Sequence, residues 1–85
     1  QRSYIAIQDD GIEMNMYGDM KNYHWQDMNE IVYDVFEEDA NRYTFTMKDG
    51  QSIELAENGQ LEALRGTLLS IARKHNINSV ENYHE

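Results

Sequence analysis

Residues 58–77 are the one long segment of this chain with a clear helical period, and they constrain everything else. Apolar side chains recur there at steps of three and four, which places them along one side of a helix of about four turns. The stripe consists of Leu61, Leu64, Leu68, Ile71, Ala72 and His75. Because one amphipathic helix cannot bury its own stripe, the rest of the chain must supply a facing surface.

Both ends of this helix carry recognisable signals. Asn58 and Gly59 are both acceptable N-caps, and Glu62 lies in the first turn, where a carboxylate suits the helix dipole. At the other end, Asn76 can adopt the left-handed conformation that stops a helix, and Ile77 can fold back as the hydrophobic contact of that cap. The sequence therefore predicts a helix that begins at residue 58 or 59 and ends near residue 76.

Before the helix, apolar and polar residues alternate with the period of β-strands. The alternation covers residues 4–7, 12–17, 43–48 and 52–55, a further strand is expected at 21–25, and an apolar run spans 31–36. Turn residues separate these segments at 9–11 and 18–19, and Asp49-Gly50 predicts a two-residue hairpin turn. Residues 26–30 are expected to bend, and residues 37–41 to form a solvated acidic loop.

These patterns predict an α+β fold, an antiparallel meander of about five strands whose apolar face is covered by one C-terminal helix. The domain is expected to span residues 1–77, and residues 78–85, which lack periodicity, to form a frayed tail. The sheet residues expected to face the helix stripe are Ile5, Ile7, Ile12, Met14, Met16, Phe45, Met47, Ile53 and Leu55.

Charge excludes several classes of partner. The chain has 85 residues, of which 16 are acidic and 7 are basic, and its net charge is -9. So few dispersed cations cannot neutralise several phosphates, which disfavours binding to nucleic acid or to anionic lipid. No apolar run approaches 18 residues, so neither a membrane span nor direct membrane insertion is expected. Since the sequence begins with Gln1, it is expected to be a processed product or an excised piece, either cytoplasmic or tethered to a membrane.

Neither a metal site nor catalysis is predicted. The chain has no cysteine, and His24, His75 and His84 lack the spacing of metal ligands. The acidic clusters at 9–10 and 37–39 do not follow a calcium-loop pattern, so we expect them to form solvated turns. No nucleophile elbow or glycine-rich phosphate loop is present in the sequence. We therefore expect no enzyme and no cofactor.

Short motifs in the chain resemble those of the bacterial pleckstrin-homology-like domains. They are D-D-G-I at 9–12, Y-x-W-x-D-M at 23–28 and K-D-G at 48–50, followed by an alternating strand and a closing helix. In that family seven strands precede the helix, so about five strands leave closure of the barrel open. The resemblance implies an interaction scaffold, often within a membrane-anchored protein. It does not imply phosphoinositide binding here, because the basic pocket is lacking.

Two classes of function remain. The first is a non-catalytic protein-interaction or regulatory module, which could be the soluble part of a membrane-anchored bacterial protein. The second is an acidic decoy or inhibitor that occupies a basic, nucleic-acid-binding surface of another protein. Binding by the first should survive salt, whereas the affinity of the second should fall steeply as salt screens its charges. The first is favoured, because the acidic residues are spread around turns instead of lining one helix.

The binding residues predicted from the sequence are Val32, Phe36, Tyr17 and Trp25. Within residues 31–36, one set of alternate side chains suits the core, which leaves Val32 and Phe36 on the outer face of the strand. An antiparallel sheet normally presents polar residues to water, so this second apolar set needs an explanation. Either a bulge near residues 29–30 or an additional strand turns these side chains inward, or they form a docking patch with Tyr17 for a partner protein or a second copy. Trp25 is expected either to anchor the thin core or to contribute to binding.

Net charge also predicts how stability responds to salt. Nine net negative charges on so small a body repel one another, and salt shortens their reach to about 8 Å at physiological ionic strength. Raising sodium chloride from very low to moderate concentration should therefore raise the melting temperature, measured by circular dichroism. A flat or falling response would show that local ion pairs outweigh the global repulsion.

Overall fold

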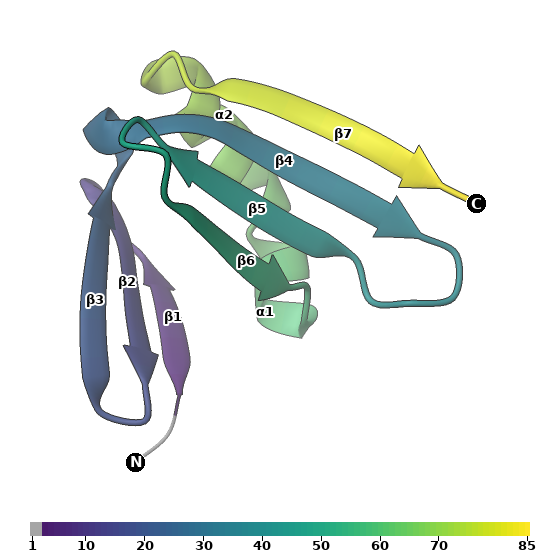
Figure 1. Cartoon of the computed structure of the whole chain (residues 1–85), viewed down its shortest axis with the longest axis horizontal. Coiled ribbons are helices and arrows are strands. Elements are labelled where there is room, and N and C mark those ends of the chain that lie inside the picture. Colours follow the sequence, from purple (N-terminus) through teal and green to yellow (C-terminus); the bar gives the residue numbers. More distant parts are fainter. Residues whose placement is uncertain (1–2) are drawn as a thin grey trace.

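A computed structural model describes residues 3–85 and contains seven strands arranged in two sheets (Figure 1). The first sheet is antiparallel and joins strands β1 (Tyr4–Ile7), β2 (Gly11–Met16) and β3 (Asp19–His24). A 3-10 turn (Trp25–Asp27) leads into β4 (Met28–Phe36), β5 (Arg42–Met47) and β6 (Ser52–Ala56). Helices α1 (Gly59–Ala63) and α2 (Arg65–Lys74) follow, and β7 (Asn78–His84) completes a four-stranded sheet of order β6-β5-β4-β7.

The helix lies where its period predicts, and both caps are confirmed. The Asn58 side chain accepts a hydrogen bond from the Leu61 N–H at 3.0 Å. At the other end Asn76 has a φ of 56°, and the Ile77 N–H donates to the Ala72 carbonyl at 2.8 Å, as in a Schellman cap. The helix is interrupted at Leu64, whose N–H bonds three residues back instead of four and so tightens that turn.

Residues 78–84 form a strand, so the expectation of a frayed tail at 78–85 is wrong. Strand β7 runs parallel to β4, and Glu30 pairs with Asn78 at one end while Phe36 pairs with His84 at the other. Parallel strands need a crossover connection, and the helix supplies it. The helix is therefore followed by a strand and is not the last element. Its cap positions β7, because Ile77 is buried directly before the strand starts.

The arrangement of strands corrects two further expectations. Six strands precede the helix instead of about five, and within residues 3–85 the two sheets do not join into a closed barrel. The loop between β5 and β6 has three residues, because the Met47 N–H bonds the Gln51 carbonyl at 2.8 Å across Lys48, Asp49 and Gly50. Gly50 takes a φ of 93°, as is usual in a three-residue loop with a bulge. The two-residue turn predicted at Asp49-Gly50 is therefore wrong.

A bulge interrupts the pairing of β4 with β5 between Met28 and Glu30. Met28 and Ile31 are an odd number of residues apart, so in a regular strand they would point to opposite faces. The extra residue lets both point into the core, where both are buried. A bulge near residues 29–30 is thus present, but it re-aims Met28 and not Val32, the residue that one alternative from the sequence required it to turn inward.

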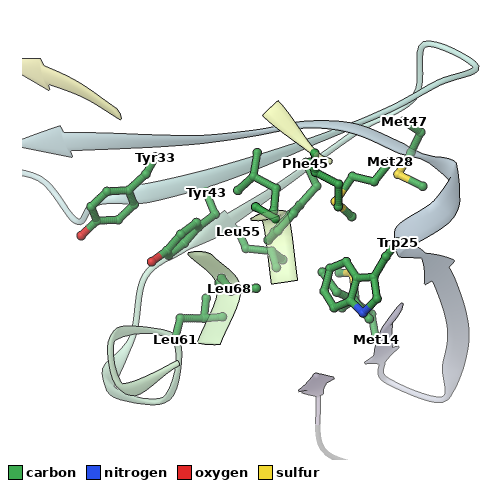
Figure 2. Packing of buried hydrophobic residues seen from close by; sticks show 14 residues of the cluster. Met14, Trp25, Met28, Tyr33, Tyr43, Phe45, Met47, Leu55, Leu61 and Leu68 are labelled. Carbon is green, nitrogen blue, oxygen red and sulfur yellow. The ribbon is translucent and has the colours of Figure 1, made fainter. Parts of the chain in front are cut away.

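The core lies between the helix and both sheets (Figure 2). Trp25, Phe45 and Leu61 are its most completely buried large side chains, and they come from the 3-10 turn, from β5 and from α1. The sheet residues predicted to face the helix are buried or packed against the core, with one exception. Met16 is 48 % exposed, because the far end of β2 extends beyond the helix. Among the described residues, no helix is long and apolar enough to span a membrane.

Truncation of Leu68 tests this packing. Its side chain is 2 % exposed, so Leu68→Ala should destabilise the domain by roughly 2 to 5 kcal/mol through lost burial and the cavity left behind. Chemical denaturation monitored by circular dichroism measures the change. Ser70→Ala, on the exposed side of the same helix, is the control and should have little effect. Equal midpoints for both variants would mean that the stripe is not docked.

Candidate functional site

The outer face of the four-stranded sheet, turned away from the helix, carries a short row of two apolar side chains, Val32 and Val80. Ile31 and Tyr33 of β4 are buried in the core, so Val32 between them points to the other side. Val32 lies opposite Thr44 on β5 and opposite Val80 on β7, and all three are half-buried. In Figure 1 the helix lies behind this sheet, and none of the elements drawn for the described chain covers its near side. The alternative that a bulge or an additional strand turns Val32 inward is therefore wrong.

Phe36 lies at the end of β4 within a group of polar side chains. Its ring stacks on the His84 ring with centroids 4.7 Å apart, and the Arg42 guanidinium lies 5.2 Å from the Phe36 centroid. The Phe36 N–H donates to the Asn41 side-chain oxygen at 3.0 Å. Phe36 is therefore held in place by neighbours on β5, on β7 and in the acidic loop, and it remains partly exposed on the outer face.

Asp34 connects the ends of β4 and β7. Its Oδ1 lies 2.8 Å from His84 Nε2 and accepts a hydrogen bond from the Asn82 amide at 3.4 Å. The hydrogen bond from His84 lowers the pKa of Asp34 below its ordinary value, and its effect exceeds the opposing effect of burial. The charged form of Asp34 therefore stabilises the folded arrangement around Phe36.

Acidic residues surround this end of the outer face. Phe36 and His84 line a shallow hollow whose other sides are formed by Glu37, Glu38, Asp39 and Glu85. The acidic loop 37–41 predicted from the sequence is present as a bend between β4 and β5. The surface around Phe36 is therefore lined mainly by carboxylates.

The structure separates the four residues predicted to bind. Val32 and Phe36 share the outer face, whereas Tyr17 occupies the β2–β3 turn of the other sheet. Tyr17 is therefore not on a neighbouring strand, as the docking-patch prediction required. Trp25 is 1 % exposed and its indole N–H donates to the Gln8 carbonyl at 3.1 Å, so it belongs to the core and does not contribute to the outer face (Figure 2).

Two residues of the outer face were missed from the sequence, Val80 and His84, because both lie in the segment expected to fray. The sequence does contain a signal for a strand after the helix. An amphipathic helix closed by a cap at Asn76 and followed by a short segment is typical of a strand–helix–strand unit, in which a parallel strand comes next. The polar composition of β7 obscured it, since only Val80 and Tyr83 are large and hydrophobic among its seven residues.

A second polar cluster lies beneath the sheet. The Tyr33 hydroxyl donates to Glu57 Oε1 at 2.9 Å, and the Asn41 amide donates to the same oxygen at 3.0 Å. The Tyr43 hydroxyl is buried nearby, and burial is the main cause of the raised pKa of both phenols. Both phenols therefore stay protonated at neutral pH. Since Asn41 also bonds Phe36, this cluster fixes the loop that supports the outer face.

Within the described residues, no group of three or more His, Asp or Glu side chains could hold a metal ion. His24 lies 3.8 Å from Asp10, far along the chain from the His84 and Asp34 pair. No model of a protein family matches the chain, and no curated protein matches its sequence.

The lowered pKa of Asp34 predicts a specific acid sensitivity. A carboxyl group whose pKa is lower in the folded state contributes stability that is fully present above its unfolded value, about 3.9, and is lost as pH falls through the folded value. Asp34→Asn should therefore melt at a lower temperature than the wild type at about pH 5, and the difference should shrink toward about pH 2. Asp39→Asn in the exposed loop controls for loss of one carboxylate. A difference that is independent of pH would contradict this account.

Proposed function

We propose that the chain is a non-catalytic protein-interaction module that binds an extended segment of a partner protein at the outer face, beside β7. One observation carries the proposal. The half-buried apolar row formed by Val32 and Val80 ends at a sheet edge, because β7 pairs with β4 and with no other strand of residues 3–85. The main-chain groups on the other side of β7 can pair with an added strand, and Val80 offers an apolar neighbour for its side chains.

The pattern of β7 indicates the chemistry of this partner. A strand added there places alternate side chains beside Val80 on the outer face and beside Glu81 on the inner face. Apolar residues suit the first row. Basic residues suit the carboxylates around Phe36 and the net charge of -9. The proposed partner is therefore an extended segment with apolar residues beside Val80 and basic residues at the end that lies near Phe36.

The resemblance to bacterial pleckstrin-homology-like domains supports an interaction role, because that family provides scaffolds. The order of elements departs from the family, since β7 follows the helix. For that reason the proposal depends on the outer face and not on the family.

Substitution of Val80 by lysine tests the proposal. Val80→Lys places a cation in the apolar row and should weaken capture of a partner from a cell lysate by at least about tenfold. Ser52→Lys adds the same charge on the same face at the opposite sheet edge, so it should leave capture unchanged. Both variants must retain the wild-type circular dichroism spectrum.

Salt separates the proposal from its alternatives. Capture should persist from about 0.1 M to about 1 M salt, over which the Debye length falls from roughly 10 Å to roughly 3 Å. If the wild type and both variants all fail to capture a partner in 1 M salt, that result would favour the acidic decoy. Sedimentation of the isolated chain as a dimer that Val80→Lys dissociates would identify the occupant as a second copy.

A further inference from the structure

Exposed hydrophobic side chains gather at the far end of the three-stranded sheet. Five large hydrophobic residues are exposed in the described chain, and four of them lie here, namely Tyr4, Met16, Tyr17 and Met20. Tyr17 is 78 % exposed in the β2–β3 turn, and the Tyr4 hydroxyl contacts the Met20 sulfur at 3.6 Å. We call these four residues the hairpin tip. In Figure 1 the tip points away from the helix and from β7.

The hairpin tip makes no visible contribution to the core. The buried residues of β2 are Gly11, Ile12 and Met14, and burial ends before Met16. Methionine and tyrosine are typical of adaptable binding surfaces, because methionine is flexible and tyrosine combines an apolar ring with a polar end. Tyr4 and Met20 lie on one face of the sheet, because both pair with Asn15, and Met16 lies on the other face, so the tip exposes hydrophobic side chains on both sides of the turn. Exposed hydrophobic side chains that gather in this way are characteristic of an interaction site.

Tyr17 also adopts an unfavourable backbone conformation. Its φ is 55° and that of Gly18 is 93°, so both central residues of the turn are left-handed, as a type I′ turn requires. Asparagine followed by glycine is the preferred pair in such turns, whereas a bulky residue with positive φ is an outlier. The turn is held by the Asn15 side-chain oxygen, which accepts from the Gly18 N–H at 2.7 Å. A tyrosine thus occupies a turn position that local backbone preference would give to asparagine. Backbone strain of this kind clusters at functional sites.

We infer that the hairpin tip is a second docking site, which inserts Tyr17 into an apolar pocket rimmed by basic residues on a partner protein. The tip is a projecting turn, so it fits a concave surface. Asp19 lies two residues from Tyr17, and Glu13 accepts a hydrogen bond from the Tyr4 hydroxyl. Among the residues that the structure describes at this end of the sheet, these two carboxylates outnumber one cation, Lys21, which favours a basic rim.

The same charges argue against the other possible occupants. Two copies meeting tip to tip would bring together Glu13 and Asp19 of each, on bodies that each carry a net charge of -9. Insertion into a bilayer would carry Asp19, two residues from Tyr17, toward hydrocarbon, where an ionised side chain is costly. A basic protein pocket avoids both penalties.

The thermal stability of the Tyr17→Asn variant tests whether the backbone at the hairpin tip is strained. Relief of the strain should raise the melting temperature of the variant by roughly 4 to 8 °C. A fall in melting temperature would show that Tyr17 packs structurally, and that would overturn the proposal.

Photo-crosslinking of the full chain in cells tests the occupant. A benzophenone amino acid at position 20 should give an adduct with another protein, and Tyr17→Asn in the same chain should reduce that adduct at least about tenfold. Val80→Lys should leave the adduct unchanged, which separates this site from the outer face. The captured protein, purified, should bind the wild type more tightly than Tyr17→Asn, with an affinity that falls as salt rises. Absence of an adduct, a lipid adduct, an adduct with a second copy, or an adduct indifferent to Tyr17→Asn would each overturn the proposal.

Discussion

Burial of the helix stripe against both sheets is the interaction on which the rest of the structure depends. Leu61 and Leu68 are almost fully buried, and they pack in one cluster with Phe45 of the larger sheet and Met14 of the smaller one. A domain of this size buries a comparatively small fraction of its surface, so this shared core must stabilise every element. It also decides which side of β4 faces inward, and hence places Val32 on the outer face. The Schellman cap then directs Ile77 into the core and starts β7 beside β4.

Polar contacts fix the ends of the strands that the core has brought together. Asn41 donates to Glu57 and accepts from the Phe36 N–H, so one side chain joins the acidic loop to the end of β6 and to the end of β4. The His84 and Asp34 contact joins β4 to β7 at the same end. Phe36 is therefore positioned by the hydrogen bond from its N–H to Asn41 and by the contacts of its ring with His84 and Arg42, and it is only half-buried. A ring held in this way can stay partly exposed without losing its orientation, which is what a binding surface requires.

Local chemistry made much of this fold predictable from the sequence. The helix with both caps and the alternating strands follow from side-chain periodicity and backbone preference, which act over a few residues. What could not be predicted depends on distant partners. Strand β7 is polar, and its order depends on pairing with β4, which lies far back in the sequence. Tyr17 and Val32 belong to different sheets, a division that no local pattern encodes. The outer face was therefore half predicted, with Val32 and Phe36 found and Val80 and His84 missed.

The net charge explains how so small a domain can present two apolar surfaces. An open strand edge and a cluster of exposed methionine and tyrosine side chains are both hazards for self-association. Inward-pointing charge is one device that protects an edge, and Glu81 on the inner face of β7, paired with Arg65 of the helix, fits that description. Repulsion between copies that each carry a charge of -9 adds a long-range barrier that acts on both surfaces at once. A basic partner reverses the sign of this barrier, so the same acidic residues that keep copies apart would draw that partner in.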